Sequence, residues 1–142
     1  MIKLYTILVE AIRQEGEKTY PNECCGFILG QIKEDGVKEA ETLIPIKNAR
    51  EAEEQYHRFE IGPEDFIKAD NQARKENQEI IGFYHSHPDH PAYPSEYDRE
   101  HALPFYSYII VSVDKGTASA ITSWELEASD RSRFIEEKIV WQ

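Results

Sequence analysis

Hydrophobic residues first recur along the chain at helical spacing, at Leu4, Leu8, Ala11 and Ile12, with charged and amide side chains between them. This period predicts a helix from Leu4 to about Lys18, with one apolar face turned toward the rest of the protein. The pair Pro21-Asn22 follows and predicts the end of the helix.

Short apolar runs bounded by glycine, proline or turn residues then predict a series of strands. Turn signals at Glu34-Asp35-Gly36 and at Asp114-Lys115-Gly116 favour tight connections between neighbouring strands. The predicted strands run from Cys25 to Gly30, Val37 to Ile46, Tyr56 to Ile61, Ile80 to His85, Tyr106 to Val113 and Thr117 to Leu126, with an edge strand from Phe134 to Trp141.

A second helix is predicted to begin at Gly62-Pro63-Glu64-Asp65 and to continue toward Glu76, because proline and acidic residues favour a helix start. A short third helix is expected to begin near Ser95, inside a proline-rich loop. Helices and strands alternate too irregularly for a doubly wound parallel sheet. We therefore expect an α/β fold with a largely antiparallel or mixed sheet, helices packed on it, and one domain over residues 1–142.

Sixteen basic against 27 acidic residues give a net charge of −11, which disfavours nucleic acid and anionic lipid as partners. No apolar run is long enough to span a membrane. The N-terminal residues lack the pattern of a signal peptide, and the two cysteines, Cys24 and Cys25, are adjacent and unsuited to a disulfide. These features predict a cytoplasmic protein that interacts with neither nucleic acid nor membrane.

The candidate chemistry lies in the segment from His85 to Asp98. His85 and His87 are two residues apart at the end of a predicted strand, so their side chains point to the same face and can reach one metal ion. Asp98, in the first turn of the predicted short helix, can supply a carboxylate. Two imidazoles, one carboxylate and an open fourth position are typical of a catalytic zinc site.

Hydrolysis at such a site also needs a base, and Glu23, at the mouth of another predicted strand, is our candidate. Ser95 could donate a hydrogen bond to the oxyanion of a tetrahedral intermediate. Each residue also has a simpler interpretation. Ser95 could cap the short helix, and Glu23 could be a solvated surface acid.

Glu23, His85-Ser86-His87-Pro88, Ser95 and Asp98 together resemble the full motif of the JAMM (MPN+) zinc metalloproteases. The resemblance implies a curled, mixed β-sheet flanked by helices, similar to the cytidine deaminase fold. It implies that His85, His87 and Asp98 bind one zinc ion. It further implies that Glu23 is the general acid/base that activates the zinc-bound water, and that Ser95 stabilises the oxyanion.

Family members hydrolyse peptide or isopeptide bonds at the C-terminal tails of ubiquitin-like proteins. This short acidic chain resembles the compact prokaryotic members, which are associated with sulfur-carrier proteins of ubiquitin-like fold. The resemblance therefore implies a ubiquitin-like or sulfur-carrier protein as the partner. The sequence does not indicate the oligomeric state.

Two other functions are weighed against this one. A non-catalytic MPN scaffold would not need the intact motif, and a zinc deaminase would use a Cys-x-x-Cys pair that the chain lacks. Asp89, His90 and His101 are left out of the predicted metal site. Cys24 and Cys25 are interpreted as small core residues, and His57 and the acids of residues 51–54 as parts of a solvated loop.

Overall fold

The computed structural model describes residues 1–47, 61–130 and 133–141. Its helices are α1 (Thr6–Thr19), α2 (Pro63–Lys75) and α3 (Glu96–His101). Its strands are β1 (Ile2–Leu4), β2 (Cys25–Ile32), β3 (Lys38–Ile46), β4 (Glu79–Pro88), β5 (Ser107–Asp114), β6 (Thr117–Leu126), β7 (Phe134–Glu137) and β8 (Ile139–Trp141). Among these residues, no helix is both long enough and apolar enough to cross a membrane.

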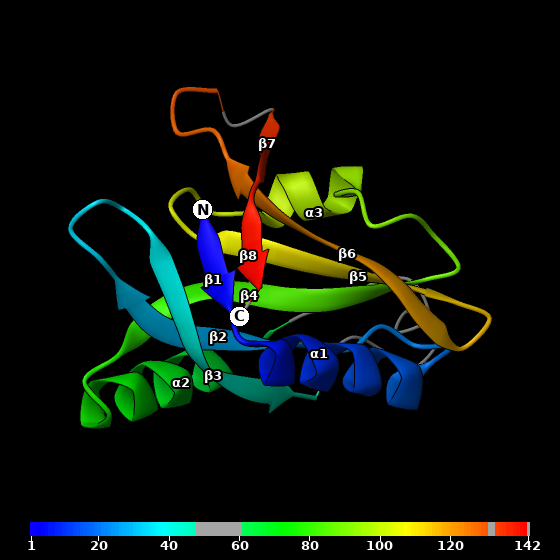
Figure 1. Ribbon diagram of the computed structural model, residues 1–142, viewed down its shortest axis with the longest axis horizontal. Helices are drawn as coiled ribbons and strands as arrows, with labels where there is room; N and C mark the ends of the chain where they lie inside the picture. Colours follow the sequence, from blue (N-terminus) through cyan, green and yellow to red (C-terminus); the bar gives the residue numbers. More distant parts are fainter. Residues whose placement is uncertain (48–60, 131–132, 142) are drawn as a thin grey trace.

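The described strands form one mixed sheet in the order β7-β6-β5-β4-β2-β3-β1-β8. Strands β4 and β5 are parallel, as are β1 and its two neighbours, while the other neighbouring pairs are antiparallel. The sheet curls strongly, and β7 and β8 follow each other along its open side (Figure 1). The prediction of a curled, mixed sheet flanked by helices is therefore confirmed.

Helices α1 and α2 cover opposite faces of the sheet, and each has a hydrophobic core beneath it (Figure 1). Val9 and Ile12 of α1 are buried against a cluster that includes Tyr84. Ala69 and Ala73 of α2 are buried against a cluster that includes Phe27, Leu29 and Phe83. The alternation of side chains along β4 thus supplies both cores, as expected for a strand buried on both faces.

Three sequence predictions need correction. Leu4 belongs to β1 and not to the first helix, because Ile2 and Leu4 are both buried on one side of a short strand. The predicted edge strand from Phe134 to Trp141 is two strands, with Lys138 between them. Strand β4 continues past His85 to Pro88, because its last residues pair with β5.

One prediction lies largely outside the described residues. The predicted strand over residues 56–61 lies there except for Ile61, which precedes α2 without belonging to a strand. The loop assigned to residues 51–57 lies outside the described residues as well.

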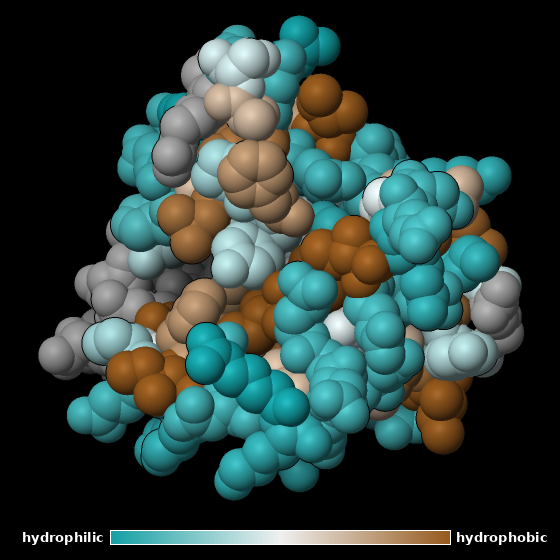
Figure 2. Space-filling view, turned by 90° about the vertical axis from the view of Figure 1, so that its left-hand side faces the viewer, coloured by the Kyte–Doolittle hydropathy of each residue, from teal (hydrophilic) through white to brown (hydrophobic). Residues whose placement is uncertain are grey.

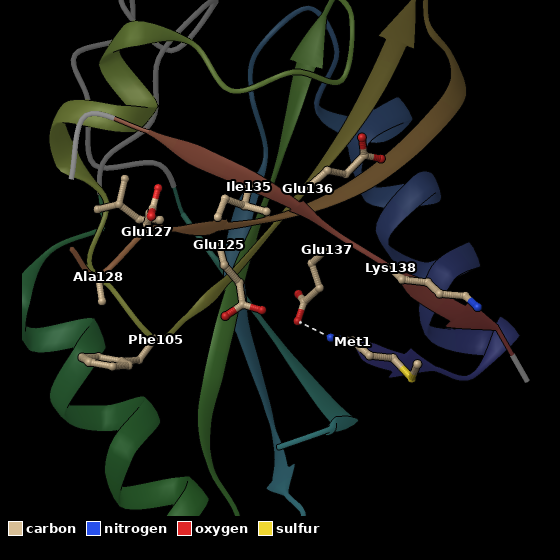
Figure 3. Close-up of a pocket in the computed structure, with 10 residues that line it drawn as sticks. Met1, Phe105, Glu125, Glu127, Ala128, Ile135, Glu136, Glu137 and Lys138 are labelled. Atoms are coloured by element: carbon tan, nitrogen blue, oxygen red, sulfur yellow. Dashed lines mark hydrogen bonds and ion pairs between the residues drawn. The ribbon is translucent and has the colours of Figure 1, made fainter. Parts of the chain in front are cut away.

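A buried polar cluster surrounds Glu137, the last residue of β7, and its contact with Met1 is drawn in Figure 3. The carboxylate of Glu137 accepts hydrogen bonds from the hydroxyls of Ser107 (2.6 Å) and Ser123 (2.8 Å) and contacts the amino group of Met1 (3.2 Å). The ammonium group of Lys38, on β3, donates to Ser107 at 2.8 Å. Hydrogen-bonded charges therefore connect strands from both ends of the sheet.

Candidate metal centre

Two histidines of the candidate site project from β4, a central strand of the sheet. His85 pairs with Cys25 of β2, and His87 pairs with Ser112 of β5, so pairing with neighbouring strands holds the backbone of β4 at both histidines. Both side chains are almost completely buried. Their Nε2 atoms lie 3.1 Å apart, which confirms that the two imidazoles share one face of the strand.

Helix α3 brings Asp98 to the histidines. Its Oδ2 atom lies 3.3 Å from Nε2 of His85 and 3.1 Å from Nε2 of His87. The helix begins with a capping box in which the Ser95 hydroxyl accepts from the Asp98 amide at 3.0 Å and the Asp98 carboxylate accepts from the Ser95 amide at 2.9 Å. The cap therefore determines where the carboxylate of Asp98 points.

The separation of these three atoms suits a tetrahedral zinc ion. Two ligand atoms bound at about 2.0–2.1 Å to one zinc ion lie about 3.3 Å apart at the tetrahedral angle. The observed separations among His85, His87 and Asp98 are 3.1 to 3.3 Å. Two imidazole nitrogens and one carboxylate oxygen are also a donor set that zinc accepts, so the residues present fit the ion.

The electrostatic environment favours an ionised Asp98 and a neutral His85, whereas it favours protonation of His87 in the absence of a metal ion. Burial lowers the pKa of His85 and favours the neutral imidazole. Burial would raise the pKa of Asp98, but the two neighbouring imidazoles hold it well below its usual range. For His87, burial acts to lower the pKa, yet the hydrogen bond to Asp98 and its negative charge raise it overall. The centre thus combines an ionised carboxylate with at least one neutral imidazole.

The Nδ1 atom of His87 lies 3.0 Å from the carbonyl oxygen of Pro91. A carbonyl can only accept, so Nδ1 carries a proton, and Nε2 is the ring nitrogen that is directed toward Asp98 and His85. The sequence analysis did not identify this contact, because a backbone carbonyl leaves no sequence signal. The sequence indicated only that the loop after β4 is rich in proline, which restricts its backbone.

Glu23 is buried beside the same centre, although it lies far from the histidines in sequence. One carboxylate oxygen of Glu23 and one nitrogen each of His85 and His87 lie within 4.8 Å of one another. The next residue, Cys24, donates its amide to the Ser86 hydroxyl at 2.8 Å, and the Ser86 amide donates to the Cys24 carbonyl at 3.2 Å. These two bonds place Glu23 next to β4.

Ser86 is therefore a structural part of the site that sequence analysis missed. Its hydroxyl lies on the face of β4 opposite to the histidines and is completely buried. Its position between two histidines was the available signal, because alternation along a strand turns the middle residue to the other face.

The residues excluded from the metal site lie apart from it or have other contacts. Asp89 accepts from the Lys115 amide (2.7 Å) and the Tyr20 hydroxyl (2.7 Å). His101 is exposed, and its ring stacks on Tyr97 with centroids 4.1 Å apart. Both cysteines are buried free thiols, and burial raises the pKa of Cys24 to about 12, so neither is an activated nucleophile.

Residues of the candidate centre line two cavities. The first, of about 310 Å³, is lined by polar and proline-rich segments: Glu23, His87, Pro88, His90, Pro91, Tyr93 and Ser95. The second, of about 270 Å³, lies between α2 and α3 over β4 and β5, with mainly apolar and aromatic residues: Ile61, Phe66, Phe83, His85, Tyr97, Asp98, His101, Leu103 and Tyr108. The three candidate ligands are thus divided between two openings.

A curled α/β sheet with a His-x-His strand and a converging aspartate defines a candidate metal centre of the hydrolase type. The family of prokaryotic homologues of the JAB domain matches residues 6–127. The chain belongs to this family, and the resemblance to JAMM proteins is confirmed.

Curated relatives include proteins from archaea and mycobacteria. A desampylase of Haloferax volcanii is 35% identical over 95 residues, 66% of this chain and 65% of that protein, so the match spans less than two thirds of the relative. A desampylase of Pyrococcus furiosus is 32% identical over 118 residues, 83% of this chain and 75% of that protein. A CysO-cysteine peptidase of Mycobacterium tuberculosis is 30% identical over 106 residues, 74% of this chain and 68% of that protein.

Solved structures agree with the fold. A protein from Desulfitobacterium hafniense has a TM-score of 0.85 at 26% identity, covering 100% of this chain and 93% of its own. A JAB1/MPN domain protein from Archaeoglobus fulgidus has a TM-score of 0.60 at 18% identity, covering 100% of this chain and 97% of its own, and this likeness concerns the fold alone.

Proposed function

We propose that this chain is a JAMM-type zinc peptidase or isopeptidase acting at the C-terminal tail of a ubiquitin-like or sulfur-carrier protein. The observation that carries the proposal is the convergence of His85 Nε2, His87 Nε2 and Asp98 Oδ2 within 3.3 Å, with Glu23 buried beside them. Family membership and the desampylase and CysO-cysteine peptidase relatives support the same assignment.

The proposed roles follow from the position of each side chain. His85, His87 and Asp98 would hold one zinc ion, which when bound supplies Lewis-acid chemistry by lowering the pKa of a water molecule and polarising the scissile carbonyl. Glu23 takes a proton from the attacking water and later gives it to the leaving amine as the carbon–nitrogen bond breaks. The Ser95 hydroxyl donates to the oxyanion, while its oxygen continues to accept from the Asp98 amide.

The partner in this proposal is a protein whose flexible tail can enter a narrow site. The two cavities of about 310 and 270 Å³ suit an extended chain and not a folded surface. We place the protein in the cytoplasm, where its two free thiols stay reduced, and we treat residues 1–142 as one MPN+ domain.

Metal analysis combined with a cleavage assay tests the proposal. Purified wild-type protein, Glu23→Gln and His87→Ala are compared for zinc content and for cleavage of a ubiquitin-like protein that carries a C-terminal extension. We expect about one zinc per chain in the wild type and in Glu23→Gln, with cleavage lost by a factor of at least about 100 in the latter. His87→Ala should lose both zinc and cleavage.

Glu34→Gln is the matched control, because Glu34 is exposed in the turn between β2 and β3. It should retain zinc and full activity. Cleavage by Glu23→Gln at the wild-type rate would refute the assignment of the base. A wild-type protein that binds no metal when zinc is supplied would refute the hydrolase and favour a binding scaffold.

A further inference from the structure

The two cavities that residues of the candidate metal centre line differ in chemistry. Glu23 and Ser95 line the cavity of about 310 Å³ and do not line the other. His85 and Asp98 line the cavity of about 270 Å³, which we call the α2–α3 pocket. A substrate chain that extends across the centre would therefore meet a different environment on each side of the bond to be cleaved.

The position of Glu23 indicates the direction in which a substrate chain would lie across the metal centre. In the proposed function Glu23 gives a proton to the leaving amine, so that amine must lie on the side of the centre that Glu23 lines. The acyl part of the substrate, which precedes the scissile bond, must then extend to the opposite side. That side is the α2–α3 pocket.

The walls of the α2–α3 pocket include aromatic rings that contact one another. The rings of Phe83 and Tyr108 are stacked with centroids 5.4 Å apart, and Phe66 lies 6.1 Å from Phe83. The amide of Leu103 donates to the Tyr108 hydroxyl at 2.8 Å, which holds the loop after α3 against the pocket. The walls are thus joined to one another by ring contacts and by this hydrogen bond.

The charge of the pocket points to an apolar occupant. Although the chain carries a net charge of −11, Asp98 is the only acid among the described lining residues, and it faces the two histidines. Lysine and arginine are absent from the same described lining. At the outer end, the Leu103 side chain is 45% exposed and offers apolar surface to an incoming chain. Hydrophobic side chains also gather among hydrophilic ones on the face shown in Figure 2.

We propose that the α2–α3 pocket binds one large apolar side chain, aromatic or aliphatic, from the last few residues before the scissile bond. Phe66 and Leu103 determine this preference from the two sides of the pocket. The inference rests on the proposed function and adds to it both the direction of the bound chain and the class of residue selected.

A scan of substrate tails tests this inference. Each of the four positions before and the two positions after the scissile bond is changed in turn to Phe, Leu, Ala or Asp, and kcat/KM is measured. At one position before the bond, we expect Phe or Leu to exceed Ala by about 10-fold and Asp by more. The advantage should fall to about 2-fold or less in Leu103→Glu, where a charge meets the apolar side chain.

Ile135→Glu is the matched control, because Ile135 is 48% exposed, close to the 45% of Leu103, and lies outside the α2–α3 pocket. It should keep the wild-type preference. A second readout needs no turnover: calorimetric binding of Leu and Ala tail peptides to zinc-loaded Glu23→Gln should show the same ratio of about 10. Phe66→Ala is a second pocket variant, should Leu103→Glu fail to fold.

The outcomes separate this inference from the proposed function. Cleavage with equal rates for apolar and polar residues before the bond would overturn the pocket assignment and leave the hydrolase intact. A preference confined to positions after the bond would overturn the direction of the chain. Absence of both cleavage and metal binding would refute the proposed function, and this inference with it.

Discussion

His87 donates from Nδ1 to the carbonyl of Pro91, and the same carbonyl accepts from the Tyr93 amide at 2.9 Å. Both lone pairs of one oxygen are thus occupied, one by His87 of β4 and one by Tyr93 of the proline-rich loop. The hydrogen bond from Nδ1 orients the ring of His87. The loop therefore acts as a support for a ligand as well as a connection between β4 and α3.

Replacement of the carboxylate ligand tests the metal centre apart from its histidines. Asp98→Asn keeps the shape of the side chain but removes its charge, so we expect zinc affinity to fall by more than about 100-fold. The measurement is a competitive zinc titration with a chromophoric chelator. Glu100→Gln, an exposed position on the same helix, should bind zinc as the wild type does. Equal affinities in both variants would remove Asp98 from the ligand set.

One substitution can separate the helix-capping role of Ser95 from its proposed role in catalysis. Ser95→Gly retains most of the helix cap, because glycine at this position costs only a few tenths of a kcal/mol, but it removes the hydroxyl. We expect kcat to fall by about 100-fold with little change in thermal stability or zinc content. Ser95→Thr should restore most of the activity. A fall in kcat that is matched by loss of zinc would indicate a purely structural role.

The polar cluster around Glu137 predicts a pH dependence of stability. Burial would raise the pKa of Glu137, but hydrogen bonds from Glu125, Ser107 and Ser123, together with Lys38, lower it overall. A carboxyl whose pKa is lower in the folded state stabilises that state above its unfolded value of 4.5, and this contribution is lost as the pH falls through the folded value.

Glu137→Gln should therefore lower the free energy of unfolding by about 2 kcal/mol at pH 7. This difference in free energy should become smaller as the pH falls below 4.5 and through the lower pKa of Glu137 in the folded state, where the wild-type carboxyl loses its charge. Urea unfolding at both pH values is the measurement. Glu125→Gln is the comparison, because burial and its hydrogen bond to Glu137 raise the pKa of Glu125, in the opposite direction to the shift of Glu137. If Glu137→Gln lowered the free energy of unfolding by the same amount at both pH values, the charge of Glu137 would not be the cause.

Gly82 fixes the distance between the two central parallel strands. A Cβ atom at this position would lie 2.3 Å from the carbonyl oxygen of Ser107, its partner on β5. Gly82→Ala should lower the free energy of unfolding by about 3 kcal/mol and weaken zinc binding, because His85 follows on the same strand. Gly62→Ala is the control, since the nearest atom to its Cβ would be 3.8 Å away. Equal stability of the two variants would show that β4 and β5 can separate without cost.

Much of the fold follows from local patterns in the sequence. Apolar periodicity locates α2, and the Lys115-Gly116 turn, with φ of 50° and 87°, locates the β5–β6 hairpin. The short strand β1 escaped prediction because three residues give no period, and Leu4 also fits the helical spacing that follows. The division of residues 134–141 between two edges depends on pairing with β6 and β1, which local sequence does not encode.

The candidate site could be assembled from sequence only through its motif. The spacing of His85 and His87 predicts a shared face from strand geometry alone, and the structure agrees. The position of Glu23 depends on the pairing of β2 with β4 and on the bonds between Cys24 and Ser86. The two cavities depend on how α2 and α3 sit over the sheet, and no local pattern specifies that arrangement.

The pairing of β1 with β8 joins the first and last described strands of the chain. During translation β1 is synthesised long before β8. It can therefore pair with its parallel partner β8 only when nearly all of residues 1–141 have been synthesised. The nascent protein must therefore keep one side of its sheet open during translation. Contacts of such large sequence separation slow folding, and the exposed strand edges are the part of this protein that a chaperone would have to protect.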